Sequence, residues 1–224
     1  MVARKPVALD TSTICIHRGI RHHRPHLLPV DDWLDIVTAN GRVKDNIHAI
    51  DTGAEYRQSL QLFRNGGVVP ITFSDVTPEA GPGFAKLLVG RGLAIGDYDN
   101  DGKMDITVVD SEGGPLLLHN VCTTAGHWLE VRLVGRQSNR DGIGATLTAT
   151  LGSRRLLRLC HTDGSYLSAS DKRVHFGLGT ANQVDRLEVK WPSGRTSTLL
   201  NVPADKQILV DEGKAQMPTG GRAR

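Results

Sequence analysis

Apolar and polar residues alternate with a period of two through much of the second half of the chain. In residues 128–134, leucine and valine alternate with charged residues, and residues 145–151 and 186–191 repeat the pattern with threonine or charged residues between. This period predicts half-buried antiparallel strands. Because Asp-Gly and Pro-Ser-Gly turn signals separate the strands, residues 127–212 are predicted to form a small antiparallel β-sandwich or barrel-like domain.

The first half of the chain contains an internal repeat. Two pairs of stretches resemble each other in the same order: 32–37 with 102–107, and 60–65 with 116–120. In this alignment Asp35 matches Asp105. Each copy predicts a strand, an acidic loop, a second strand, a turn, a third strand, a turn and an outer strand. That order is typical of a β-propeller blade, so residues 31–125 are predicted to form propeller-like blades.

The acidic loop of the second copy, residues 97–105, carries the candidate chemistry. It has aspartates at positions 1, 3, 5 and 9 and a glycine at position 6. Carboxylates this close repel one another strongly unless a cation lies between them. Gly102 allows the sharp turn that would face them inward. The predicted ligands are the four carboxylates and one backbone carbonyl: Asp97, Asp99, Asp101, Asp105 and the carbonyl of Lys103.

An all-oxygen ligand set favours Ca²⁺ over Zn²⁺. An EF-hand is excluded, because position 12 is Val108 and not a bidentate glutamate. The flanks, residues 92–95 and 106–109, are short, apolar and partly β-branched, which predicts a calcium loop between two strands. A metal-free Asp/Asn/Gly-rich turn is the alternative. The first copy keeps only the last two carboxylate positions, Asp31 and Asp35, and no calcium is expected there.

The acidic loop and its flanks resemble the FG-GAP/VCBS repeat family over roughly residues 31–125, on the stretches 96–102 and 104–106. Residues 127–212 resemble the ASPIC/UnbV domain on four ordered stretches: 138–145, 164–168, 174–179 and 187–194. Together they look like the C-terminal part of the cartilage acidic protein-like family. The resemblance implies an all-β protein, with partial β-propeller blades followed by a small β domain. It also implies an extracellular or periplasmic location and no defined catalytic activity.

Charge and composition narrow the possible partners. The net charge is +3, but residues 1–30 carry +4 and residues 213–224 carry +3, which leaves 31–212 at −4. A basic groove for nucleic acid is therefore not supported. No stretch is apolar and long enough to span a bilayer. Residues 1–30 show no strand or helix period and are expected to be a disordered or foreign tail, and residues 213–224 a flexible basic tail.

The candidate function follows from the calcium loop, because the sequence contains no GxSxG, HExxH or P-loop motif. Ser165 and Ser168, near His161 and Asp163, are interpreted as turn residues and not as a catalytic triad. The expected function is a non-catalytic, calcium-binding module that binds an unknown protein or carbohydrate partner. Two alternatives stay open: an accessory C-terminal region of a longer enzyme, and a truncated product with no autonomous function. Both arise because the residues include no export signal and too few repeats to close a propeller.

Overall fold

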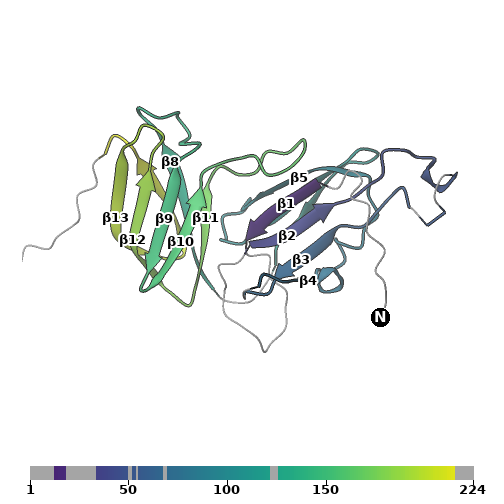
Figure 1. Cartoon of the computed structure of the whole chain (residues 1–224), viewed down its shortest axis with the longest axis horizontal. Coiled ribbons are helices and arrows are strands. Elements are labelled where there is room, and N and C mark those ends of the chain that lie inside the picture. Colours follow the sequence, from purple (N-terminus) through teal and green to yellow (C-terminus); the bar gives the residue numbers. More distant parts are fainter. Residues whose placement is uncertain are drawn as a thin grey trace, which may run out of the picture.

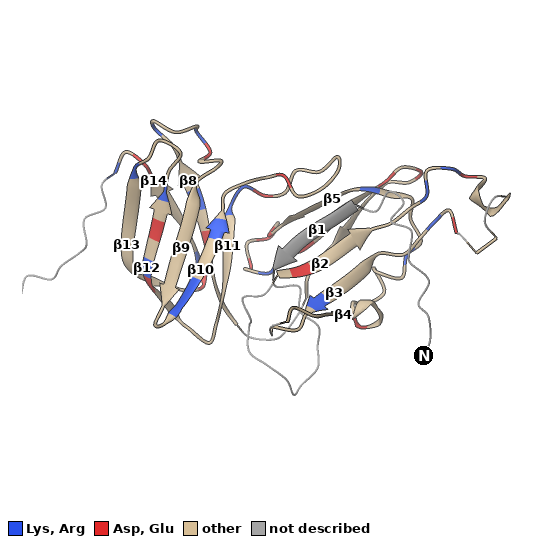
Figure 2. Ribbon diagram, in the orientation of Figure 1, with Lys and Arg blue, Asp and Glu red and all other residues tan. Residues whose placement is uncertain are grey.

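The computed structural model describes residues 13–18, 34–49, 52–53, 55–67, 70–121 and 126–214, and this part is built almost wholly of β-strands (Figure 1). Its helical segments are two short 3-10 turns, η1 (Ile47–Ala49) and η2 (Thr77–Glu79). Neither turn is long and apolar enough to cross a membrane. Figure 2 shows acidic and basic residues mixed along both halves of the molecule. The all-β prediction is confirmed.

The N-terminal unit consists of two antiparallel sheets. One has the strand order β1-β2-β3-β4, with β1 (Thr13–Arg18), β2 (Leu34–Ala39), β3 (Gln61–Asn65) and β4 (Phe73–Asp75). The other has the order β5-β6-β7, with β5 (Gly90–Gly96), β6 (Asp105–Asp110) and β7 (Pro115–Leu118). Apolar side chains of both sheets form one buried core, among them Val37, Leu62, Leu93, Ile95 and Val108. This burial holds the two copies of the repeat together.

Strand β1 lies inside the segment for which no strand was predicted. It pairs antiparallel with β2, from Thr13 opposite Ala39 to Arg18 opposite Leu34. Three of its residues are β-branched, which favours an extended backbone, and the pairing satisfies the backbone groups along one edge of β2. The prediction of a tail without strands is therefore wrong for Thr13–Arg18. The rest of residues 1–30, and residues 215–224, lie outside the described part of the chain.

The C-terminal unit packs two further sheets around a separate core. One has the order β10-β9-β12-β13, with β9 (Thr146–Leu151), β10 (Arg154–Leu159), β12 (Gln183–Lys190) and β13 (Thr196–Pro203). The other has the order β11-β8-β14, with β8 (His127–Val134), β11 (Val174–Gly179) and β14 (Lys206–Asp211). The predicted alternation holds on β8, where Leu129, Val131 and Leu133 are buried in the core.

One strand pair departs from the predicted antiparallel sandwich. Strand β14 runs parallel to β8, so the sheet β11-β8-β14 is mixed. The chain leaves one sheet at the end of β13 and enters the other at Lys206, with only Ala204 and Asp205 between. Because β14 joins a different sheet from the strand before it, it is not a hairpin partner of β13, and its direction is set by the crossover.

The end of β14 anchors the loop that follows β8. The carboxylate of Glu212 accepts hydrogen bonds from the backbone N–H groups of Arg136, Gln137 and Ser138 at 2.5, 2.7 and 2.9 Å. It also accepts bonds from the hydroxyls of Ser138 and Ser193. Burial raises the pKa of Glu212, but the hydrogen bonds from Ser193, Ser138 and Arg136 outweigh it and lower the pKa to about 2. These bonds therefore favour the ionised carboxylate.

We expect Glu212 to stabilise the fold above its unfolded-state pKa of 4.5, with that stabilisation lost as the pH falls toward the folded pKa of about 2. Glu212→Gln should lower the urea midpoint at pH 7 and flatten its decline between pH 4.5 and pH 2. The control is Glu188→Gln, which removes a carboxylate that pairs with Arg186 on the sheet surface. Equal pH profiles for the two variants would contradict the assignment.

Candidate metal centre

The two copies of the repeat share one hydrogen-bonding arrangement around an aspartate. In the second copy, Asp105 Oδ1 accepts a bond from the backbone N–H of Asn120 at 2.7 Å. In the first copy, Asp35 Oδ1 accepts the equivalent bond from Asn65 at 2.9 Å. Each asparagine side chain donates in turn to the carbonyl of the residue before the aspartate, at 3.2 Å in both copies. The sequence alignment of Asp35 with Asp105 is thereby confirmed.

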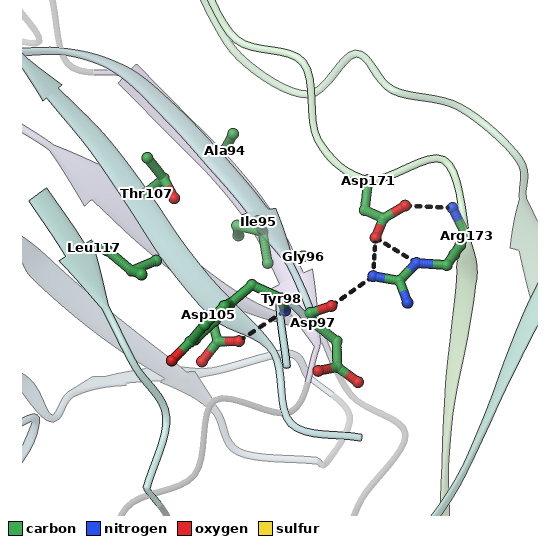
Figure 3. A pocket seen from close by; sticks show the side chains of 10 residues that line it. All are labelled: Ala94, Ile95, Gly96, Asp97, Tyr98, Asp105, Thr107, Leu117, Asp171 and Arg173. Atoms are coloured by element: carbon green, nitrogen blue, oxygen red, sulfur yellow. Dashed lines mark hydrogen bonds and ion pairs between the residues drawn. The ribbon is translucent and has the colours of Figure 1, made fainter. Parts of the chain in front are cut away.

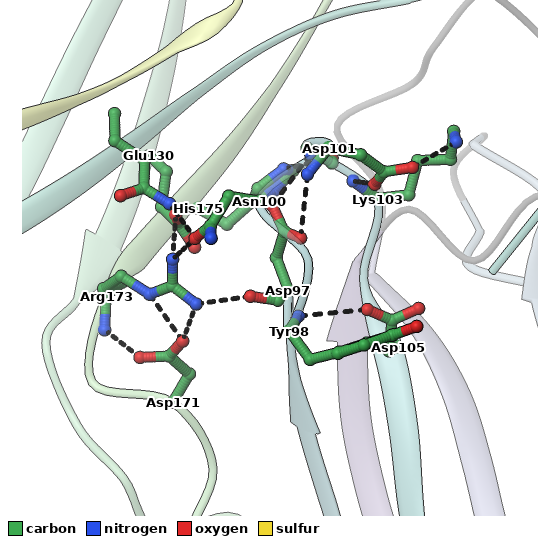
Figure 4. Close-up of polar contacts among 12 residues, drawn as sticks. Asp97, Tyr98, Asn100, Asp101, Lys103, Asp105, Glu130, Asp171, Arg173 and His175 are labelled. Atoms are coloured by element: carbon green, nitrogen blue, oxygen red, sulfur yellow. Dashed lines mark hydrogen bonds and ion pairs between the residues drawn. The ribbon is translucent and has the colours of Figure 1, made fainter. Parts of the chain in front are cut away.

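The loop between β5 and β6 curls around the carboxylate of Asp97. Asn100 and Gly102 have positive φ angles of 62° and 83°, which turn the backbone back on itself. As a result, the N–H of Asp101 donates to Asp97 Oδ1 at 3.1 Å and the N–H of Gly102 donates to Asp97 Oδ2 at 2.8 Å (Figure 4). Asp97 is completely buried. Burial raises its pKa against these backbone hydrogen bonds, which favour the ionised form.

Three of the predicted ligands come together in this loop. Asp97, Asp99 and Asp105 each offer a carboxylate oxygen, and these oxygens lie within 4.8 Å of one another. Asp97 and Asp105 are buried, and Asp99 is exposed. The second oxygen of Asp105 accepts a bond from the N–H of Tyr98 at 3.1 Å, which fixes the orientation of this carboxylate. The donors are all hard oxygens on a tightly curled loop, and this set fits Ca²⁺.

The other two predicted ligands are arranged differently. Asp101 lies with Asp99 and His119 in a neighbouring cluster, in which His119 Nε2 is 3.1 Å from Asp99 Oδ2. Lys103 donates its backbone N–H to Asp101 Oδ1 at 2.8 Å and pairs its ammonium with the other oxygen. Burial raises the pKa of Asp101, but Lys103 outweighs it and the net pKa is lowered. The coordination of an ion by the Lys103 carbonyl stays a prediction.

An open cavity of about 220 Å³ adjoins the carboxylates (Figure 3). Its walls come from the sheet β5-β6-β7, from the acidic loop and from the segment before β11, and include Ala94, Thr107, Leu117, Tyr98, Asp105, Asp171 and Arg173. Tyr98 and Leu117 are 55% and 49% exposed. The lining of the cavity thus combines apolar side chains with carboxylates and a guanidinium.

Residues of the C-terminal unit contact the acidic loop, and no pattern in the sequence predicts this contact. Arg173, Glu130 and His175 lie beside the loop in Figure 4. The alternation on β8 placed Glu130 on a solvent face, but Glu130 is fully buried. His175 is only 9% exposed, because the loop covers it. Contacts between residues so far apart in the chain leave no periodic trace in either segment.

Of the two serines interpreted as turn residues, Ser168 makes hydrogen bonds to its surroundings, whereas the buried hydroxyl of Ser165 has no hydrogen-bond partner among the described residues. The hydroxyl of Ser168 donates to the carbonyl of Tyr166 at 2.8 Å and accepts a bond from the N–H of Leu93 at 2.8 Å. His161 Nδ1 lies 3.0 Å from the carboxylate of Asp163. These contacts assign Ser168 to the junction of the two units.

On the first copy of the repeat, Asp31 and Asp32 lie outside the described residues.

Comparison with protein-family models matches residues 135–217 to the family ASPIC and UnbV. No curated protein matches the chain. The match covers β9 to β14, while β8, which lies between β11 and β14 in the sheet, comes just before it. The FG-GAP/VCBS resemblance of residues 31–125 stays a prediction. Residues 135–217 of this chain are thus similar to the ASPIC/UnbV domain.

Proposed function

We propose that this protein is a non-catalytic module that Ca²⁺ stabilises, and that it works outside the cytoplasm by binding a protein or carbohydrate partner. The observation that carries the proposal is the approach of the carboxylates of Asp97, Asp99 and Asp105 to within 4.8 Å of one another. Two of these three residues are buried, so water cannot fully screen their mutual repulsion. A bound divalent cation would supply the missing positive charge.

The proposed role of the ion is structural. Asp97 follows β5 and Asp105 begins β6, so an ion held by both would fasten the two strands where they leave the sheet. Calcium modules outside the cell bind with dissociation constants of about 10⁻⁴–10⁻³ M. Free calcium at about ten times the dissociation constant would then stabilise the fold by about 1.4 kcal/mol. A permanent clamp can work with that affinity, whereas a cytosolic sensor needs tighter binding.

The cavity beside the carboxylates supports the proposed partner binding. Exposed Tyr98 offers an aromatic face, and Leu117 an apolar surface, at the edge of the acidic loop. Aromatic rings that flank polar groups are common where a protein contacts a sugar ring or a peptide side chain. An ion that orders the loop would also fix the position of Tyr98, since the N–H of Tyr98 bonds to Asp105.

We expect millimolar Ca²⁺ to raise the melting temperature of the purified chain by about 3–6 °C relative to EGTA. Asp99→Ala/Asp101→Ala should abolish this increase, because it removes two carboxylates of the loop. The matched control is Asp45→Ala/Asp163→Ala, which removes two exposed carboxylates outside the loop and should keep the increase. A cooperative transition that is indifferent to calcium would leave residues 97–105 as an ordinary turn.

The internal repeat offers a sharper comparison between equivalent aspartates. Asp105→Asn and Asp35→Asn each weaken the same charge-assisted bond to an asparagine N–H, and each should lower stability in EGTA by about 1 kcal/mol. Only Asp105→Asn removes a predicted ligand, so only this variant should weaken calcium binding in a calorimetric titration. Equal calcium affinity in the two variants would remove Asp105 from the ligand set.

A further inference from the structure

Side chains of the C-terminal unit donate hydrogen bonds to the acidic loop of the N-terminal unit. We propose that Arg173, paired with Glu130, is a positioning residue for the calcium loop, so that the C-terminal domain sets the affinity of a site whose ligands all belong to the N-terminal unit. The proposal rests on the calcium binding proposed above. It extends that proposal to residues that do not touch the ion.

Arg173 holds the loop at two points (Figure 4). Its Nη2 donates to the carbonyl of Asp97 at 2.5 Å, and its Nη1 donates to Asn100 Oδ1 at 2.7 Å. The same guanidinium bonds to Glu130 Oε2 at 2.8 Å and to Asp171 Oδ2 at 2.6 Å. A planar guanidinium with five N–H donors in fixed directions can make these bonds together, and a lysine ammonium cannot reproduce that geometry.

The two points that Arg173 holds are the points that shape the metal site. Asp97 supplies the first predicted ligand, so a bond to its carbonyl fixes the backbone from which the carboxylate projects. Asn100, with its φ of 62°, is the residue at which the chain turns back. That turn aims the N–H groups of Asp101 and Gly102 at the Asp97 carboxylate. Movement of either point would spread the three converging carboxylates.

Glu130 keeps Arg173 in place from within the C-terminal domain. It is fully buried, and its Oε2 forms an ion pair at 2.8 Å with Arg173, whose side chain is 18% exposed. Burial raises the pKa of Glu130 to about 7, and Arg173 opposes this increase. An acidic group on a buried strand face is costly unless a cation and hydrogen bonds compensate it. The pair therefore explains why a glutamate occupies a position that the acidic loop covers.

The sheet β11-β8-β14 presents a continuous row of polar side chains to the loop. His175, Glu130 and Gln207 are register neighbours across its three strands. His175 Nε2 donates to the carbonyl of Gly102 at 2.9 Å, and Gln207 Nε2 donates to Asn100 Oδ1 at 2.5 Å. The loop is thus bonded at residues 100 and 102 by side chains of one sheet face, and at residue 97 by Arg173, which directly precedes β11.

Steric fit adds to these bonds at Gly102. A Cβ atom at this position would lie 2.1 Å from the indole of Trp128, so the backbone of the loop packs directly on that ring. The Trp128 ring stacks in turn against His175, with the centroids 6.2 Å apart and an interplanar angle of 9°. Glycine is needed here for its positive φ and also for this close approach.

Next to the loop, the edge of β5 is paired by the same domain. Ser168 Oγ and Ser170 Oγ accept bonds from the N–H groups of Leu93 and Ile95 at 2.8 and 3.2 Å. The N–H of Asp171 donates to the carbonyl of Ile95 at 2.9 Å. The segment that pairs with β5 therefore leads straight to Arg173. Coupling between calcium and this contact is reciprocal, so calcium binding must also strengthen the contact.

The test is the calcium dissociation constant of the full chain, measured by titration calorimetry. Arg173→Ala should weaken calcium binding about tenfold, within the usual range of coupling between sites. Arg173→Lys should restore little of the loss, because one ammonium cannot span both loop contacts. Asn100→Gly removes the acceptor while it tolerates the positive φ, and it should also weaken binding. The control is Arg136→Ala, which breaks a pair with Asp211 remote from the loop.

A merely structural role for Arg173 would lower stability and leave calcium affinity unchanged, as Arg136→Ala should. A second readout is amide exchange at Leu93 and Ile95, which calcium should slow in the wild type and not in Arg173→Ala. Wild-type affinity in folded Arg173→Ala and in Asn100→Gly would overturn this inference alone. If Arg173→Ala does not fold, Asn100→Gly decides the question. Absence of calcium binding in the wild-type chain would overturn both this inference and the proposed function.

Discussion

A buried carboxylate at the junction of two β units is the constraint on which this structure depends. Asp97 is fully buried, and its oxygens draw in the backbone of the loop through two N–H groups. Arg173 donates to the carbonyl of Asp97, whereas its carboxylate accepts hydrogen bonds from backbone N–H groups of the loop. Two further carboxylates point to the same centre. An arrangement of this kind is stable when a cation completes it, and this is the physical basis of the proposed function.

At the contact between the two units, each unit covers polar groups of the other that would otherwise be exposed to solvent. The C-terminal unit supplies two serine hydroxyls and a backbone N–H to the backbone groups of Leu93 and Ile95 on β5. In return the acidic loop covers Trp128, Glu130 and His175, which would form an exposed polar and aromatic face on the C-terminal sheet. Exposed edges favour aggregation, so this mutual cover also protects the chain. The site and the contact therefore form one structural unit.

Much of this fold could be predicted from local pattern. The alternation in residues 128–134, the equivalence of Asp35 and Asp105, and the resemblance of the C-terminal residues to the ASPIC/UnbV domain all hold in the structure or the comparisons. The convergence of Asp97, Asp99 and Asp105 agrees with their spacing. Asp101 departs from the arrangement that the spacing predicts. The ammonium of the neighbouring Lys103 pairs with the Asp101 carboxylate and compensates its charge without an ion.

The remaining features depend on contacts between distant segments, which periodicity cannot report. Alternation assigned Glu130 to the face opposite the core, and it could not reveal that the acidic loop covers that face. Nor could it reveal the pairing of β1 with β2 or the parallel direction of β14.

The most direct test of the central claim is a crystal structure of the chain grown with Tb³⁺ or Ca²⁺, with anomalous scattering measured. The account predicts one strong peak bounded by the carboxylates of Asp97, Asp99 and Asp105. Ordered density for the loop with no peak at millimolar ion would contradict it.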